Sequence, residues 1–147
     1  MKILICGLPG SGKSTLAKPF AELIGGVWLN ADTVRTQYDD WDFSIKGRLR
    51  QTLRMCHLAD GVVMAGKIAV ADFVCPTQLA RDWFNADYTV WMDTIKKSQY
   101  EDTNVIFVKP DYYDYHVSSW FKDTHTELSK VVTNYMLKQQ NKPTERL

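Results

Sequence analysis

The order of apolar segments along the chain predicts an α/β protein, with a parallel sheet of about five strands and helices on both faces. Short apolar runs alternate with segments of helical periodicity over the whole sequence. A glycine-rich segment joins the first apolar run to the first helical segment, and no linker or repeat interrupts the alternation. The length of 147 residues suits one core, so we expect a single domain spanning residues 1–147.

Each expected element follows from a local pattern. Short apolar runs predict strands, at residues 2–6, 27–29, 67–73, 88–92 and 105–108. Helical spacing and capping residues predict helices, at residues 13–24, 33–38, 45–65, 77–84 and 118–140. Asp32 and Ser44 are the expected N-caps of the second and third helices. The last helix should bury one stripe, made of Trp120, Leu128, Val131, Val132, Tyr135 and Met136, and a polar tail should follow at 141–147.

The glycine-rich segment is a complete phosphate-binding motif. It reads Gly7-Leu8-Pro9-Gly10-Ser11-Gly12-Lys13-Ser14, which matches the pattern G-x-x-x-x-G-K-[ST]. Backbone N–H groups of such a loop, and the N-terminus of the helix after it, converge on phosphate oxygens. Lys13 is expected to contact the β- and γ-phosphates of ATP, and Ser14 to ligate Mg²⁺. The motif places the chain in the three-layer P-loop nucleoside triphosphate hydrolase and kinase fold, with an ATP-binding segment of Gly7, Leu8, Pro9, Gly10, Ser11, Gly12, Lys13, Ser14 and Thr15.

Two carboxylates follow expected strands, where α/β proteins place their active sites. Asp32 comes after the second strand and is the candidate that orients or deprotonates an acceptor hydroxyl. Asp72 lies near the end of the third strand and is the candidate that holds Mg²⁺, directly or through water. The alternatives are a helix cap for Asp32 and a structural strand-end carboxylate for Asp72.

Basic residues gather around the third helix. Arg48 and Gln51 fall on one of its faces, while Arg50 and Arg54 fall on a neighbouring face. An arginine face that points at the strand ends would bind a second anion. The alternative for these arginines is a solvated charged face.

Composition restricts the partners of the protein. The net charge of +1 argues against an extended nucleic-acid surface, although it allows one nucleotide to bind. No apolar stretch approaches the roughly 20 residues of a membrane span, and no signal peptide is evident, so we expect no membrane partner and a cytoplasmic location. Three aromatic residues, Trp41, Trp83 and Tyr112, are candidates for an exposed homodimer interface, and the alternative is that they belong to the core.

Four segments resemble adenylylsulfate kinases in order and spacing. They are Gly7 to Ala17, Leu29 to Arg35, Phe43-Ser44 with Arg48, and Val70 to Pro76. The resemblance covers roughly residues 2–93. Members of that family transfer the γ-phosphoryl group of ATP to the 3′-hydroxyl of adenosine 5′-phosphosulfate.

The resemblance also implies roles for individual residues. Asp32 matches the aspartate near the acceptor hydroxyl, and Phe43 matches the aromatic residue that stacks on the acceptor adenine. Arg35 and Arg48 match arginines that bind the acceptor, and Gln51 stands where the family usually has an asparagine. These positions imply a small anionic, nucleotide-like acceptor beside ATP.

The chain departs from the family at several positions. Asn30, Ala31 and Gly47 replace two acids and a glycine, and residues 94–110, the candidate lid, contain no arginine. Only Lys96, Lys97 or Lys109 could substitute for one. Two alternatives therefore stay open: a kinase for another hydroxyl, such as a nucleoside, a sugar acid or a polynucleotide 5′ end, and a nucleotide-binding protein without turnover.

Overall fold

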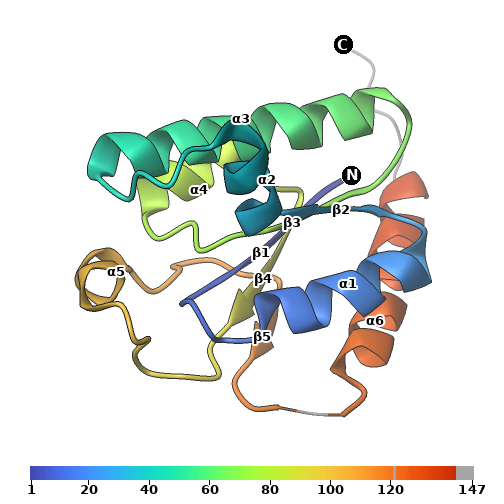
Figure 1. Cartoon of the computed structure of the whole chain (residues 1–147). Helices are drawn as coiled ribbons and strands as arrows, with labels where there is room; N and C mark the ends of the chain where they lie inside the picture. Colours follow the sequence, from blue (N-terminus) through green and yellow to red (C-terminus); the bar gives the residue numbers. More distant parts are fainter. Residues whose placement is uncertain (121, 142–147) are drawn as a thin grey trace.

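A five-stranded sheet forms the centre of the computed structural model of the chain (Figure 1). Its strands are β1 (Lys2–Gly7), β2 (Val27–Asn30), β3 (Ala69–Asp72), β4 (Tyr88–Met92) and β5 (Tyr115–Val117). They lie in the order β2-β3-β1-β4-β5, and every neighbouring pair is parallel. The structure describes residues 1–120 and 122–141, so the expected polar tail lies outside the described residues beyond Asn141.

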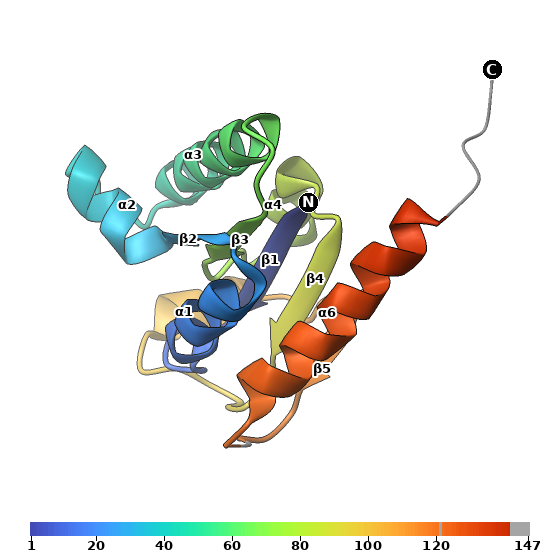
Figure 2. The same ribbon diagram turned by 90° about the vertical axis from the view of Figure 1, so that its right-hand side faces the viewer.

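Helices cover both faces of the sheet, which confirms the expected fold class. They are α1 (Lys13–Ile24), α2 (Ala31–Tyr38), α3 (Ile45–Met64), α4 (Gln78–Phe84), α5 (Glu101–Ile106) and α6 (Thr124–Gln140). Helices α1 and α6 lie side by side on one face, and α3 and α4 pack on the other (Figure 2). Within residues 1–120 and 122–141, no helix is both long and apolar enough to cross a membrane.

The central strand β1 contributes side chains to both hydrophobic cores, one on each face of the sheet. Ile3 and Ile5 join the core beneath α1 and α6, whereas Leu4 and Cys6 join the core beneath α3 and α4. All four side chains are buried. A parallel strand covered on both faces needs apolar residues at every position, which is why this strand is visible in the sequence as an unbroken apolar run.

The prediction of a strand at residues 105–108 is wrong. Val105 and Ile106 belong to α5, and the Val105 side chain is exposed. The side chain of Asn104 bonds the backbone of Ser98, which closes the turn that leads into this helix. The edge strand is instead β5, whose central residue His116 gives it no apolar pattern.

Helix α6 begins later than expected. It starts at Thr124 rather than 118, so Trp120 lies before the helix and does not belong to its buried stripe. Leu128 and Val132 are fully buried, as expected, because they pack against α1 and the sheet. Val131 points away from this core and is exposed.

The caps of α2 and α3 place the residues that follow the second strand. Asn30, rather than Asp32, caps α2, since its Oδ1 accepts a bond of 3.0 Å from the Thr33 amide. Asp32 therefore lies inside the first turn of the helix. Ser44 caps α3 as expected, through a bond from the Gly47 amide to its Oγ.

Candidate active site

The phosphate-binding loop leaves β1 and enters α1 through a tight glycine turn. Gly10 and Gly12 have φ angles of 81° and 94°, which glycine adopts at little cost. The Ser11 amide donates to the Leu8 carbonyl at 3.1 Å and closes the turn. Helix α1 begins at Lys13 without a side-chain cap, so the N–H groups of its first turn point toward the loop. This arrangement is an anion site of the kind that binds phosphate.

Lys13 lies where the loop becomes the helix. Its Nζ donates to the Leu8 carbonyl at 3.1 Å and so closes over the loop. Burial lowers the pKa of Lys13, and the nearby carboxylates of Asp72 and Asp32 oppose that shift. The two carboxylates thus favour the charged ammonium form of Lys13, which is the form that would contact phosphate.

Asp72 is the centre of a polar network at the strand ends. Its Oδ2 accepts hydrogen bonds from Ser14 Oγ at 3.1 Å, Trp28 Nε1 at 2.9 Å and Asn30 Nδ2 at 3.0 Å. The Asn30 amide also donates to Ser14 Oγ at 3.0 Å. Asp72 is buried, so these donors stabilise a charge that would otherwise be costly to place there.

The donor set beside the loop suits a hard cation. Within the described part of the chain, no three His, Cys, Asp or Glu side chains gather as a metal cluster. Magnesium does not need one, because it commonly binds through one or two protein oxygens together with phosphate and water. The oxygens of Ser14 and Asp72 meet that requirement.

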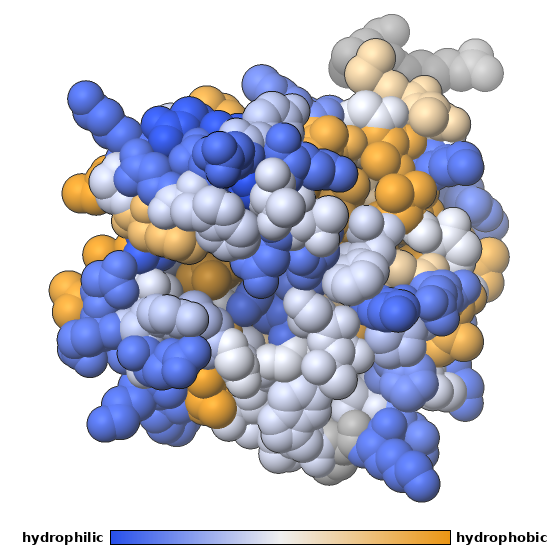
Figure 3. Space-filling view, viewed as in Figure 1, coloured by the Kyte–Doolittle hydropathy of each residue, from blue (hydrophilic) through white to orange (hydrophobic). Residues whose placement is uncertain are grey.

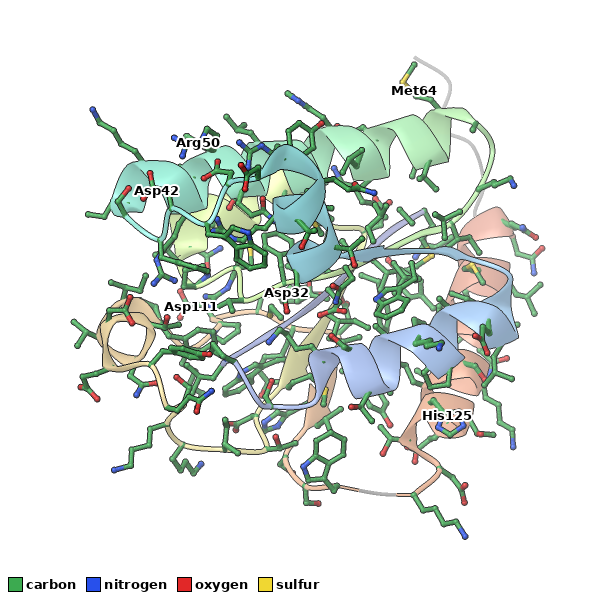
Figure 4. The ribbon with its side chains drawn as sticks, viewed as in Figure 1. Asp32, Asp42, Arg50, Met64, Asp111 and His125 are labelled. Atoms are coloured by element: carbon green, nitrogen blue, oxygen red, sulfur yellow. The ribbon has the colours of Figure 1, made fainter. Side chains whose placement is uncertain are left out.

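A cleft of about 790 Å³ runs from the loop across the strand ends. Figure 3 shows this side of the molecule, which is hollowed below the layer of α2 and α3. Asp32 lies at the start of α2 beside the cleft (Figure 4). The cleft brings together the predicted residues Lys13, Ser14, Asp32, Asp72, Phe43 and Arg48.

Phe43 and Arg48 form the far wall of the cleft. Phe43 is half-exposed, and the Arg48 guanidinium carbon lies 5.4 Å from the centre of its ring. The Arg48 Nε also donates to the Phe43 carbonyl at 2.7 Å. Both residues therefore face the cleft and are fixed relative to each other.

Arg35 and Gln51 do not line the cleft, in contrast to the roles implied for them. Arg35 is buried under the Phe43 ring, 4.2 Å from its centre, and its Nη1 donates to the carbonyls of Asp40 and Asp42. Gln51 is buried, and its Nε2 donates to the Ala31 carbonyl at 3.0 Å. Both side chains support the wall from behind.

Arg50 and Arg54 pair with an aspartate instead of lining the cleft, and of the two only Arg50 has a substantially exposed side chain. Arg50 Nε lies 2.7 Å from Asp40 Oδ2, and Arg54 Nη2 lies 2.6 Å from the same oxygen. Figure 4 shows Arg50 and Asp42 at the outer end of α3, away from Asp32. These pairs fasten the segment between α2 and α3.

Several residues around the cleft were not expected to belong to it. Trp28 and Asn30 bind Asp72, whereas Trp41, Tyr100 and Trp120 line the cleft. Trp41, one of the three residues predicted for an interface, is 50% exposed and lines the cleft. A Cβ on Gly12 would overlap the Trp120 ring, which lies against the loop. The aromatic residues are visible in the sequence, but the loops that carry them have no periodic pattern, so their place in the cleft could not be predicted.

The candidate lid, residues 94–110, contributes four residues to the cleft. Gln99, Tyr100, Asp102 and Thr103 contribute to the lining. The three lysines proposed to replace a lid arginine do not line the cleft, and Lys109 lies over the Trp91 ring instead. Among the described residues, the cations that line the cleft are therefore Lys13 and Arg48.

Comparison with solved structures places this fold among P-loop kinases. An APS kinase from Mycobacterium tuberculosis in complex with AMPPNP and APS has a TM-score of 0.74 and 18% identity, over 92% of this chain and 96% of the other. A gluconokinase from Sinorhizobium meliloti has a TM-score of 0.64 and 13% identity, over 96% and 97%. A shikimate kinase from Acinetobacter baumannii has a TM-score of 0.57 and 17% identity, over 96% and 95%. At these identities, the likeness establishes the fold.

The fold, the phosphate loop and the cleft beside it thus define a P-loop kinase. The family model for adenylylsulphate kinase matches residues 1–102, more than half of the chain. The chain belongs to the adenylylsulphate kinase family and is an ATP-dependent kinase. A comparison with curated protein sequences finds no match.

Proposed function

We propose that this protein transfers the γ-phosphoryl group of ATP to the 3′-hydroxyl of adenosine 5′-phosphosulfate. The observation that carries the proposal is that one cleft gathers groups for both substrates. Its lining includes the phosphate loop with Lys13, Asp32 at the start of α2, and Phe43 with Arg48. The family match over residues 1–102 supports the same acceptor.

The donor end suits the triphosphate of ATP. Loop amides, the α1 N-terminus and Lys13 supply positive potential to the β- and γ-phosphate oxygens. Ser14 and Asp72 would hold Mg²⁺, which neutralises phosphate charge when it is bound. Because little of this chemistry requires covalent catalysis by the protein, positioning and electrostatics are the main tasks of these residues.

The acceptor end suits an adenine nucleotide. The half-exposed Phe43 ring offers a platform for the base, and Arg48 offers donors to an anionic group. The acceptor 3′-oxygen forms a bond to the γ-phosphorus while the bond from that phosphorus to the leaving ADP oxygen breaks. Asp32 orients the hydroxyl and accepts its proton.

A panel of acceptors tests this proposal. ADP release from Mg-ATP would be measured with adenosine 5′-phosphosulfate, gluconate and shikimate, each added separately. We expect stimulation by adenosine 5′-phosphosulfate alone, with a 3′-phosphorylated product. Stimulation by one of the other acceptors would overturn the assignment of the acceptor while leaving a kinase.

One observation favours a second candidate, a kinase for a different hydroxyl acceptor. Arg35 is held under Phe43 by backbone carbonyls, so Arg48 alone offers its guanidinium to the acceptor end among the described residues. An acceptor with less negative charge, such as a sugar acid, would fit that arrangement. The panel distinguishes the two candidates directly.

A further inference from the structure

Arg48 already has an anionic partner in the cleft wall. Its Nη2 donates to Asp102 Oδ2 at 3.1 Å and to Thr103 Oγ1 at 3.1 Å. The Arg48 side chain is 12% exposed, whereas the Asp102 side chain is 68% exposed. The guanidinium is thus a fixed part of the wall, and the carboxylate approaches it from the solvent side.

This ion pair connects α3 to α5 across the cleft. The segment that carries α5 is anchored before the helix by a bond from Thr94 Oγ1 to the Ser11 carbonyl. It is anchored after the helix by a bond from the Val108 amide to the Pro76 carbonyl. Between these anchors, Asp102 and Thr103 tie the first turn of α5 to Arg48.

We propose that Asp102 determines acceptor specificity by competing with the acceptor anion for Arg48. This inference rests on the proposed adenine-nucleotide acceptor. A phosphate or sulfate group that binds Arg48 with two parallel hydrogen bonds needs Nη2, because Nη2 belongs to either fork of the guanidinium. Asp102 and Thr103 now hold the Nη2 donors. The acceptor therefore binds by displacing Asp102, and α5 loses one of its ties to α3 at the same time.

Charge explains why the two anions exclude each other. An acceptor oxyanion beside an undisplaced Asp102 would place two negative charges around one guanidinium. Arg35 does not offer the acceptor a second guanidinium, because it lies outside the cleft lining and its Nη1 donates to the carbonyls of Asp40 and Asp42. A neutral acceptor of the same shape does not compete, so Asp102 weakens the binding of anionic acceptors selectively.

The test uses Asp102→Asn, with Glu101→Gln as a matched control. Glu101 lies in the same first turn of α5, is exposed and does not pair with Arg48. The Glu101→Gln substitution therefore removes the same charge near the same helix end. Calorimetry would measure the affinity of the full chain for AMP and for adenosine, with ADP occupying the phosphate loop. We expect Asp102→Asn to bind AMP about two- to five-fold more tightly, as for loss of an exposed ion pair. Adenosine affinity and the Glu101→Gln variant should match the wild type.

Hydrogen exchange of residues 103–107 provides the second readout. Exchange should quicken in Asp102→Asn without ligand, and in the wild type when AMP is added, but not in Glu101→Gln. Unchanged AMP affinity in Asp102→Asn, an equal gain for adenosine, or unchanged exchange would overturn the role of Asp102 and leave the acceptor assignment intact. If neither AMP nor adenosine binds any variant, the adenine-nucleotide acceptor is wrong, and the competition is wrong with it.

Discussion

Lys13 is the residue whose position most directly suggests a role in binding the phosphates of ATP. It begins α1, closes over the loop and lies near Asp72 and Asp32. Lys13→Ala should reduce turnover by about a hundred-fold or more, because it removes positive charge from the transferring phosphoryl group. Circular dichroism should show an unchanged fold. Lys18→Ala, an exposed change on the same helix, should retain activity, and an active Lys13→Ala enzyme would contradict the site.

Asp32 is proposed to act on the acceptor hydroxyl and not on the binding of ATP. It lines the cleft in the first turn of α2, whereas Asn30 carries the capping bond of that helix. Asp32→Asn should therefore lower kcat by about a hundred-fold while changing the Kd for ATP little, as expected for a group that acts on the acceptor proton. Kinetics combined with ATP titration would measure both. Equal losses in kcat and ATP affinity would indicate a structural or metal-binding role instead.

The sequence predicts some of these residues better than others. Loop residues are contiguous, so the motif itself defines the local backbone and the positions of Lys13 and Ser14. Arg35 is different, because its partners are backbone carbonyls of a later segment whose path no local pattern describes. Arg48 lines the cleft, but its helical spacing could not reveal that Asp102, far along the chain, would pair with it.

At the scale of elements, the segment between α2 and α3 depends on Asp40. Arg50 and Arg54 donate hydrogen bonds to this carboxylate and hold its pKa well below the usual value of 3.8. A carboxyl whose pKa is lower in the folded state stabilises the fold above its unfolded pKa. That contribution is lost as the pH falls below the unfolded value and through the folded one.

Acid titration of an Asp40→Asn variant tests this dependence. The variant should be less stable than the wild type near about pH 7. The difference should shrink as the pH falls below about 4, where the Asp40 carboxyl of the unfolded chain takes up a proton while that of the folded protein does not. Urea unfolding at several pH values measures both proteins. Asp39→Asn, at an exposed position with a φ of 48° that asparagine tolerates, controls for loss of a charge. A difference that is constant with pH would contradict the role of Asp40.

Two elements differ from their prediction, each for its own physical reason. Residues 105–108 are apolar, but the Ser98 and Asn104 side chains start a helical turn before them. Strand β5 has only three residues and lies at the sheet edge, where the burial that creates an apolar run is incomplete. The buried strands and α3 could be predicted because their own residues carry the pattern that the sheet requires.

At the scale of the whole molecule, stability depends on a core on each face of the sheet. Leu128 of α6 is fully buried beneath α1, whereas Leu137 on the same helix is 51% exposed. Leu128→Ala should reduce the free energy of unfolding by about 2–5 kcal/mol, because it leaves a cavity in a packed core. Leu137→Ala should change it by less than about 0.5 kcal/mol. Urea unfolding of both variants checks the contrast, and equal effects would show that α6 does not pack as described.

The parallel order of the strands is what gathers the site. Loop residues follow β1, Asp32 follows β2, and Asp72 ends β3, so all three lie at the same edge of the sheet. This convergence could be anticipated from the alternation of strands and helices. The meeting of Asp102 with Arg48 could not, since the irregular segment 93–100 carries α5 to the wall that Phe43 and Arg48 form.

The central claim is phosphoryl transfer to a 3′-hydroxyl. The most direct measurement compares ADP release from Mg-ATP with adenosine 5′-phosphosulfate and with its 3′-deoxy analogue, using Lys13→Ala as the blank. The account predicts stimulation by the first, none by the analogue and none in the blank. Equal ADP release with both compounds, or none with either, would contradict it.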